Sequence, residues 1–275
     1  MNFDLHCHST ASDGLLKPAD LIGRAAANGV TALALTDHDE VAGLAEARAE
    51  AEARGLRFID GVEISVSWEG VTIHVVGLQI DPSNAELSEG LETVRSSRTR
   101  RAEKMGEALD QAGIRNSLAG AMAYVENPNI ISRTHFARFL VETGRAPDVK
   151  SVFQRYLVKG KPGYVPHQWA RLDAAVGWIR ASGGVAVIAH PGRYRLGGAD
   201  MRRLLAEFKD CGGAGVEVVT GSHAPEQYSE FARFAREFGL LASRGSDFHG
   251  DGESRADLGA LPPLPHDLKP VWHDW

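Results

Sequence analysis

Cysteine is scarce in this sequence, and long apolar runs are absent from it. The two cysteines, Cys7 and Cys211, are too few for a disulfide framework or a zinc ribbon, and they fit a reducing compartment. No apolar run approaches the roughly 18 residues of a membrane-spanning helix, and the N-terminus lacks the basic and then apolar pattern of a signal peptide. We therefore expect a cytoplasmic protein without a membrane segment.

Positive charge is also in short supply. The 275 residues include 30 Lys and Arg against 36 Asp and Glu, which gives a formal net charge of −6. This balance argues against an electrostatic grip on long nucleic acid, duplexes included. A short anionic substrate remains compatible with it, because bound metal ions would change the local charge. The length suits one large α/β barrel or two modest domains.

What the sequence does contain begins within its first fourteen residues. His6 and His8 are two apart at the end of a short apolar run. Side chains at i and i+2 of a strand point to the same face, so both histidines should project together while Leu5 and Cys7 face the other way. Asp13 follows in a Ser-Asp-Gly turn that can bend its carboxylate back toward the pair. Such a group can chelate a metal, although an isolated His-x-His is more often a chance pair of surface histidines.

Apolar strands alternate with helical patterns along most of the chain. Seven strands can be counted, mostly with helices between them, which predicts parallel strands closed into an α/β barrel. The alternation breaks over residues 83–166, which are mainly helical by pattern, with helices expected at 87–112 and 136–143. We therefore predict a barrel built from residues 1–82 and 167–275 and an inserted helical subdomain over 83–166. The remaining helices are expected at 17–28, 40–54, 172–182, 201–209 and 226–238.

Polar side chains occur at or just after the predicted strand ends, with one on a strand. Because the carboxyl ends of barrel strands share one face, these side chains should meet at one mouth. Taken singly, each could have a purely structural role: His38 could cap a helix, and Glu63 could pair with an arginine. Together they are a donor set suited to two or three ions such as Mn²⁺, Zn²⁺ or Fe²⁺. The six imidazoles and three carboxylates are those of His6, His8, Asp13, His38, Glu63, His74, His190, Asp247 and His249.

The order of these motifs resembles the polymerase and histidinol phosphatase (PHP) family. The motifs, which run from end to end of the chain, are His6-x-His8, Asp13, Thr36-Asp37-His38-Asp39, Gly61-Val62-Glu63, His74, Ala189-His190-Pro191 and Ser246-Asp247-x-His249. The resemblance implies a distorted seven-stranded, TIM-like (β/α) barrel with a two- or three-metal phosphoesterase site. The insertion, with its segments 132–137 and 156–166, is similar to the branch that contains nucleoside 3',5'-bisphosphate phosphatases and RNase AM-type 5'-to-3' exoribonucleases.

The resemblance also implies how the ligands are shared among the ions. One ion takes His6, His8, Glu63 and Asp247, a second takes Asp13, His38 and His249, and a third takes Glu63, His74 and His190. Three carboxylates against three divalent ions would leave about three positive charges, which favours a phosphate. Two ions bridged by a water should lower its pKa enough to supply hydroxide at neutral pH. Mn²⁺ is the first choice of ion, and Zn²⁺, Fe²⁺ or Mg²⁺ are alternatives.

Basic residues outside this set are candidate substrate contacts. Arg193 directly follows the His190 motif, Arg133 lies on the insertion, and the guanidinium fork fits phosphate oxygens. Lys159 and Lys161, beside Tyr156 and Tyr164, are placed to hold a second phosphate or to stack a base. For Arg133 and Arg193, a solvated loop position or a helix cap is the alternative interpretation. The basic run at Arg95, Arg98, Arg100, Arg101 and Lys104 is interspersed with glutamates, and we expect it to be a solvated helix face.

Two histidines are candidates for proton transfer. His135 or His223 could donate a proton to the leaving oxygen, and His223 is also a candidate substrate contact. A helix cap or a solvated loop position is the alternative interpretation for each of them.

The sequence thus favours a metal-dependent phosphatase for a small nucleotide, with the 3'-phosphate of a nucleoside 3',5'-bisphosphate as first choice. Stepwise 5'-end hydrolysis of short 5'-phosphorylated RNA is the second expectation, because the same pocket could serve a longer leaving group. Histidinol phosphate hydrolysis is the third. A metal-binding module without catalysis is the alternative outside enzymes, and the full donor set speaks against it.

Overall fold

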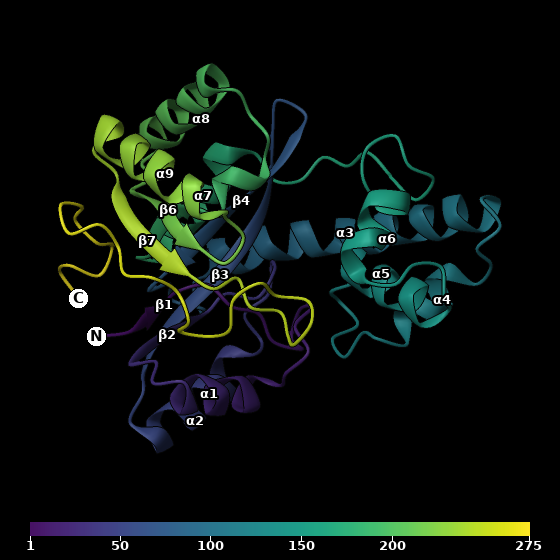
Figure 1. The fold of residues 1–275 in the computed structure, drawn as a ribbon, viewed down its shortest axis with the longest axis horizontal. Helices are drawn as coiled ribbons and strands as arrows, with labels where there is room; N and C mark the ends of the chain where they lie inside the picture. Colours follow the sequence, from purple (N-terminus) through teal and green to yellow (C-terminus); the bar gives the residue numbers. More distant parts are fainter.

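The fold is a barrel with a helical extension. The computed structural model describes residues 1–275. Its seven strands form one sheet in the order β1-β2-β3-β4-β5-β6-β7, so neighbours in the sequence are neighbours in the sheet. Backbone hydrogen bonds then join the first and last strands, because Leu5 N donates to Arg244 O at 3.0 Å and Asp247 N donates to His6 O at 2.8 Å. The sheet therefore curls into a nearly closed barrel (Figure 1).

The expected elements are present, with small differences at their ends. The strands are β1 (Phe3–Asp4), β2 (Ala32–Leu35), β3 (Arg57–Trp68), β4 (Val71–Leu78), β5 (Val185–Ile188), β6 (Gly215–Thr220) and β7 (Leu241–Gly245). The helices are α1 (Pro18–Ala27), α2 (Leu44–Arg54), α3 (Ala85–Gln111), α4 (Ser117–Met122), α5 (Arg133–Glu142), α6 (Val149–Val152), α7 (Leu172–Ala181), α8 (Gly198–Asp210) and α9 (Pro225–Phe238). A π-helical turn, η1 (Phe153–Leu157), and a 3₁₀ turn, η2 (Pro191–Arg193), complete the list.

Helix α2 begins four residues later than its alanine-rich pattern suggested. The side chain of Glu40 accepts hydrogen bonds from the backbone N–H groups of Val41 and Ala42, at 2.8 and 3.1 Å. These local bonds compete with the first turn of a helix, so the helix starts only at Leu44. Its end is as expected, because Gly55 takes the left-handed conformation with φ 66°.

Strand β4 runs against both of its neighbours, so the prediction of uniformly parallel strands is wrong there. The pairs β3–β4 and β4–β5 are antiparallel, whereas the others are parallel. A two-residue turn at Glu69 and Gly70, with φ 45° and 77°, reverses the chain directly after β3. Glu63 consequently lies inside a long strand and not at its end. His74 pairs with Ser65, two residues from Glu63, so both side chains share the inner face.

Two hydrophobic clusters lie on the two faces of the barrel wall. The larger one joins strand residues to helices α1, α2, α7, α8 and α9 and fills the layer between them. The smaller one draws on strand residues and Val271 of the C-terminal segment, so it fills the barrel interior. Leu5 belongs to this interior cluster and Cys7 to the outer one. The expectation that the two share a face is therefore wrong, because the chain leaves regular strand geometry after Asp4.

The C-terminal segment closes the end of the barrel where the strands begin. Trp272 stacks on Phe3 with ring centroids 4.3 Å apart, and Val271 N donates to Ala242 O at 2.9 Å. The polar cluster described below lies at the opposite end. No helix of the protein combines the length and apolarity that crossing a membrane requires.

The helices between β4 and α7 have a core of their own. Met105 and Leu109 of α3 and Phe136 of α5 belong to a third cluster that shares no residue with the barrel cores. Helices α4, α5 and α6 gather around the far half of α3, outside the sheet of the barrel (Figure 1). The chain then returns to β3, where Trp169 N donates to Ser67 Oγ at 2.9 Å. The insertion is thus connected to the barrel near its mouth.

Candidate metal centre

The nine predicted donors lie together at one mouth of the barrel. Loops after β1, β2, β5 and β7 and the inner faces of β3 and β4 supply them. Their ligand atoms form overlapping groups in which all atoms lie within 4.8 Å of one another. These groups are His8, Asp13, His38 and His249; His6, His190 and Asp247; His6, His8 and Glu63; and His38, Glu63 and His74.

Glu63 is the centre of the cluster. Its carboxylate is fully buried, and the ring nitrogens of His38, His74 and His190 lie 2.7, 2.8 and 2.9 Å from its oxygens. The nearest ring nitrogens of His6 and His8 each lie 3.4 Å away. A carboxylate with five imidazoles around its two oxygens is placed to be shared by more than one cation.

Three buried carboxylate oxygens have no hydrogen-bond partner, Glu63 Oε2, Asp13 Oδ1 and Asp247 Oδ1. Asp13 Oδ1 lies 3.5 Å from His249 Nε2, and Asp247 Oδ1 lies 3.4 Å from His8 Nε2. These separations are long for hydrogen bonds, but they are close to the spacing of two ligands that each stand about 2.1 Å from one ion. A buried anionic oxygen without a donor is costly unless a cation compensates it. The residues present therefore fit divalent cations.

Charge within the cluster sets the protonation of its members. Burial alone would raise the pKa of Glu63, but His74, His38 and His6 outweigh it and hold the pKa well below its usual range. Burial lowers the pKa of His8 and of His190 to about 3. The carboxylate is thus ionised and these two imidazoles are neutral near pH 7, which are the forms that ligate metals.

Backbone strain accompanies the placement of two donors. His190 has φ 26° and Asp247 has φ 53°, which is the left-handed region that side chains with a Cβ rarely adopt. Each such residue costs on the order of 1–3 kcal/mol and persists where its surroundings fix it. Nearby contacts fix Asp247, because Ser222 Oγ donates to its Oδ2 and Arg193 Nη1 lies 3.2 Å from the same oxygen.

The grouping of donors differs from the implied partition in three places. His8 lies with His6 and Glu63 as implied, but it also joins Asp13, His38 and His249. His190 joins His6 and Asp247, and His38 joins Glu63 and His74. His190 also contacts Glu63, at 2.9 Å, so it lies between two groups. The assignment of ligands to individual ions stays a prediction.

Sequence reasoning missed Glu217, which supports two of the donors. This buried residue of β6 has Oε1 2.8 Å from His6 Nδ1, and its Oε2 accepts a hydrogen bond from the backbone N–H of His190 at 2.6 Å. A carboxylate can only accept, so it directs the hydrogen of His6 to Nδ1 and leaves Nε2 for a cation. The available signal was a lone acidic residue between Val216 and Val218 in an apolar strand.

The prediction of a solvated basic face on α3 is wrong for Arg98. Its side chain is 5% exposed, and its Nε donates to Asp39 Oδ2 at 2.8 Å. Asp39 is the neighbour of His38, so Arg98 ties α3 to the cluster. Arg101 is half-buried over the ring of Trp169, at 5.2 Å. Arg100 and Lys104 are exposed, as expected.

The predicted substrate contacts are spread over the mouth and the insertion. Arg193 is half-exposed beside Asp247. Arg133, at the start of α5, lies over the ring of Phe153 at 5.4 Å. Burial lowers the pKa of Arg133 to about 10, and repulsion from Arg193 adds to the effect, so both cations act on one region. Lys159 and Lys161 are exposed in the turn after η1 and form no ion pair with the cluster.

His135 and His223 are both buried, and each accepts a backbone hydrogen bond. His135 Nδ1 accepts from Ser132 N at 3.0 Å and thereby caps α5, while His223 Nε2 accepts from Gly192 N at 3.0 Å. Burial lowers the pKa of each to about 4, so both rings are neutral near pH 7. Each has one N–H left on its other nitrogen. Their role as proton donors stays a prediction.

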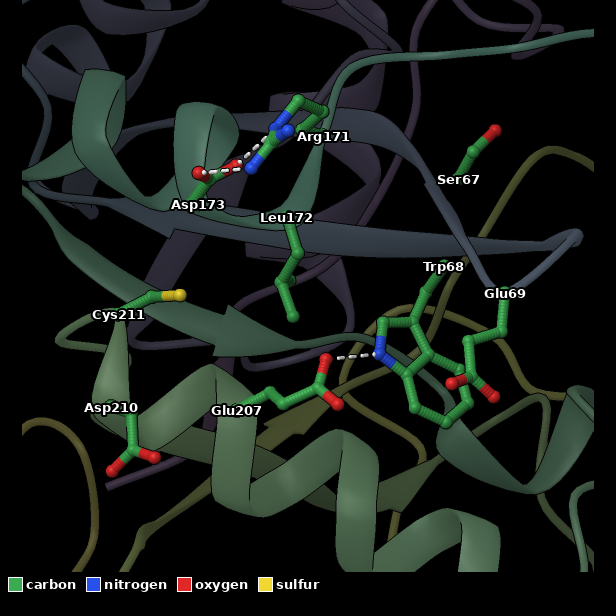
Figure 2. A pocket seen from close by; sticks show the side chains of 9 residues that line it. All are labelled: Ser67, Trp68, Glu69, Arg171, Leu172, Asp173, Glu207, Asp210 and Cys211. Atoms are coloured by element: carbon green, nitrogen blue, oxygen red, sulfur yellow. Dashed lines mark hydrogen bonds and ion pairs between the residues drawn. The ribbon is translucent and has the colours of Figure 1, made fainter.

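A separate surface pocket of ≈ 440 Å³ lies on the outside of the barrel, between the β3–β4 turn and helices α7 and α8 (Figure 2). None of the nine donors lines it. Its acidic residues include Glu69, Glu207 and Asp210, and the guanidinium of Arg171 is paired with Asp173 at 2.8 Å. Such a lining repels a phosphorylated molecule, so the pocket does not compete with the barrel mouth as a phosphate site.

The barrel and its cluster of nitrogen and oxygen donors define a class of protein that the family comparison identifies. The model of the PHP domain matches residues 4–220. This chain therefore belongs to the PHP family. The resemblance inferred from the motifs is confirmed, as is the α/β barrel expected from it.

Individual relatives match almost the whole chain. A 3',5'-nucleoside bisphosphate phosphatase of Chromobacterium violaceum is 52% identical over 273 residues, which cover 99% of this chain and 96% of the relative. A 5'-3' exoribonuclease of Haemophilus influenzae is 43% identical over 270 residues, covering 98% and 97%. Among solved structures, an amidohydrolase from Chromobacterium violaceum with bound sulfate and no metal has a TM-score of 0.97 at 51% identity, covering 100% of this chain and 95% of that one.

Proposed function

We propose that this protein is a metal-dependent phosphatase that removes the 3'-phosphate from nucleoside 3',5'-bisphosphates. The products are a nucleoside 5'-phosphate and inorganic phosphate. The observation that carries the proposal is the buried cluster of nine donors with the half-exposed guanidinium of Arg193 beside Asp247. The similarity to the Chromobacterium violaceum phosphatase over nearly the full length supports the choice of substrate.

The nine donors would hold two or three divalent cations, with Glu63 shared between them. Oxygen and imidazole donors without a thiolate suit Mn²⁺, Zn²⁺ or Fe²⁺, and we propose Mn²⁺ first. Such cations supply a water of lowered pKa as the nucleophile and offset the charge on the phosphoryl oxygens. The cytoplasmic location stays a prediction from the sequence.

The arginines of the mouth would orient the substrate. The side chain of Arg193 is 50% exposed, and its one ionic contact, with Asp247 Oδ2, is long at 3.2 Å. Its remaining N–H groups are thus available to a phosphoryl group, for which the planar guanidinium is suited. Holding the phosphorus next to the donor cluster would supply the proximity that an in-line displacement needs.

A second phosphate on the substrate would neutralise cations on the insertion. Arg101 and Arg133 have no carboxylate partner, and burial lowers the pKa of Arg101 to about 9 with a contribution from Arg133. An anion placed near these two half-buried guanidinium groups would stabilise their charge. Lys159 and Lys161 would then serve as exposed outer contacts. This arrangement favours a bisphosphate over a monophosphate.

The exoribonuclease activity of the Haemophilus influenzae relative is the second candidate. The basic residues on α3 and in the turn after η1 would allow a longer phosphodiester chain to leave the mouth in that direction. The chemistry at the cluster would be the same, with a nucleotide as the product. Relative rates on the two substrates decide between these activities.

The test is hydrolysis by purified protein loaded with Mn²⁺. We expect a higher kcat/KM for adenosine 3',5'-bisphosphate than for a 5'-phosphorylated oligoribonucleotide or for histidinol phosphate. Asp247→Asn, which keeps the shape but removes the charge, should lose activity and bound metal while its circular dichroism is retained. Faster release of nucleotides from RNA would favour the exoribonuclease, and no turnover of any substrate by fully loaded protein would contradict the proposal.

A further inference from the structure

Helix α5 connects the insertion to two barrel loops that carry donors of the cluster. We infer that Ser132 and Arg138 of this region are positioning residues that hold Asp13 and the loop after His249 where one cation needs them. The insertion would thereby set the affinity of the group formed by His8, Asp13, His38 and His249. This inference rests on the proposed metal centre and on no particular substrate.

Ser132 fixes one oxygen of Asp13 and leaves the other free. Its hydroxyl oxygen caps α5 by accepting from Thr134 N at 3.0 Å, and its single hydrogen is donated to Asp13 Oδ2 at 2.8 Å. Both residues are buried. Because Oδ2 accepts this bond, Asp13 Oδ1 is the oxygen left for a cation, and it has no hydrogen-bond partner. It lies 3.8 Å from His38 Nε2 and 3.5 Å from His249 Nε2.

Arg138 bridges the two loops with one guanidinium. Its Nη2 donates to the backbone oxygen of Asp13 at 2.6 Å, and its Nε and Nη2 donate to the two oxygens of Glu253 at 2.8 Å each. Glu253 lies in the turn after His249, where the Oγ of Ser254 accepts from the His249 backbone N–H at 2.7 Å. The Arg138 side chain is 8% exposed, so solvent screens this charged bridge little.

The two loops lie outside the named strands and helices. An isolated β-bridge between Cys7 and Phe248 and the backbone hydrogen bonds from His8 N to Phe248 O at 2.9 Å and from Leu15 N to His249 O at 2.7 Å join them to each other. The bonds from Ser132 and Arg138 add the connection to α5, and the Ser132 bond is the one that orients the Asp13 carboxylate. Ligands that are already in place lose less freedom when a cation binds, and removing a residue that orients a ligand typically lowers metal affinity 10- to 100-fold. The group of His6, His190 and Asp247 receives no hydrogen bond from α5. Loss of the bridge should therefore affect one class of bound ion and spare the others.

The test is a titration of metal-free protein with Mn²⁺ alone, followed by the signal of free Mn²⁺ in electron paramagnetic resonance. For Arg138→Gln we expect one class of site to bind 10- to 100-fold more weakly, with the remaining classes unchanged. Glu253→Gln, which weakens the same bridge from the barrel side, should show a smaller loss in the same class. Arg236→Gln is the matched control, because it breaks a two-bond pair with Asp267 on the surface, and its titration should equal that of the wild type.

Several outcomes would overturn the inference. Wild-type titrations in both bridge variants would do so, as would equal weakening of every class, since that result indicates general destabilisation. If Arg138→Gln fails to fold, Glu253→Gln decides by the same criterion. Wild-type protein that binds Mn²⁺ but hydrolyses no bisphosphate would contradict the proposed function and leave this inference standing. Wild-type protein that binds no Mn²⁺ would overturn both.

Discussion

Glu63 at the mouth of the barrel must be both ionised and buried. No solvent surrounds its carboxylate, and the imidazoles of His38, His74 and His190 stabilise the charge instead, with ring nitrogens at most 2.9 Å from its oxygens. The types of donor could be predicted from the sequence, because each one occurs in a recognisable motif. The residues that orient these donors could not be predicted. Glu217 holds His6 and His190, and Arg98 holds Asp39 beside His38, through contacts between distant segments that no local pattern indicates.

Substitution of Arg193 by alanine should raise the KM for a nucleoside 3',5'-bisphosphate about 10- to 100-fold, with a smaller effect on kcat. A charge-assisted hydrogen bond to phosphate is worth about 1.5–3 kcal/mol, which corresponds to that range. Steady-state kinetics with Mn²⁺ measures the effect. Arg195→Asn is the control, because Arg195 is exposed two residues away and its φ of 54° suits asparagine. An unchanged KM in Arg193→Ala would remove it from the substrate contacts.

His223 should make the protein less stable in acid. Burial lowers its pKa to about 4 from 6.5, and only 3% of its surface is exposed. The folded state therefore binds fewer protons than the unfolded state between pH 6.5 and 4, and stability falls as the pH falls through this range. By pH 5 the loss from this residue is about 2 kcal/mol.

The variant His223→Gln offers an acceptor to the N–H of Gly192 but takes up no proton. Its free energy of unfolding should therefore fall by about 2 kcal/mol less than that of the wild type between pH 7.5 and 5. Urea denaturation of both proteins in chelator measures the difference without a contribution from metal loss. Parallel pH profiles would show that the ring is not held neutral by the fold.

At the level of elements, the reversed strand β4 shows where pattern reading stops. Alternating strands and helices correctly indicated a barrel, and the helix and strand positions agree closely with the sequence patterns. The direct turn at Glu69 and Gly70 is too short for a parallel connection, so β4 had to be antiparallel. Leu5 is a second case, because its side chain faces inward through irregular backbone that no periodicity describes. Both failures arise where the barrel departs from regular repeats.

The seam between β1 and β7 depends on a glycine. A Cβ on Gly245 would lie 2.3 Å from the Cβ of His6 and 2.7 Å from its backbone nitrogen. We expect Gly245→Ala to push the strands apart, with a loss of about 1–3 kcal/mol in the free energy of unfolding and weaker metal binding. Gly177→Ala is the control, because no atom lies within 4 Å of the added methyl group and α7 should gain up to about 1 kcal/mol. Urea denaturation of both variants compares them, and equal stability would contradict the close packing of the seam.

At the scale of the whole molecule, the two ends of the barrel have separate tasks. The donors occupy the end where the parallel strands finish, and Trp272 and Val271 close the other end against Phe3 and Ala242. Catalysis and stability are expected to divide in the same way in such barrels. The C-terminal segment gave no usable pattern in the sequence, because its role depends on the shape of the opening that it fills.

Trp272→Ala should therefore lower the free energy of unfolding by about 2 kcal/mol, since a half-buried indole and its stacking partner lose contact. The kcat/KM of the folded variant should equal that of the wild type. Denaturant titration and steady-state kinetics at a temperature where both proteins are folded give the two values. His273→Ala, an exposed neighbour, should change neither. A fall in kcat/KM with an unchanged free energy of unfolding would contradict the assignment of stability to the end of the barrel that Trp272 closes.

The closure of β1 on β7 also constrains biosynthesis. Of the nine donors, His6 and His8 are translated first, whereas Asp247 and His249, which complete their groups, are translated last. A nascent chain that stalls before the last strand therefore carries an open sheet with seven of the nine donors, and two of the four groups of donors lack a member. Premature truncation anywhere upstream of residue 247 should yield a product that metal cannot rescue, however much of the insertion it contains.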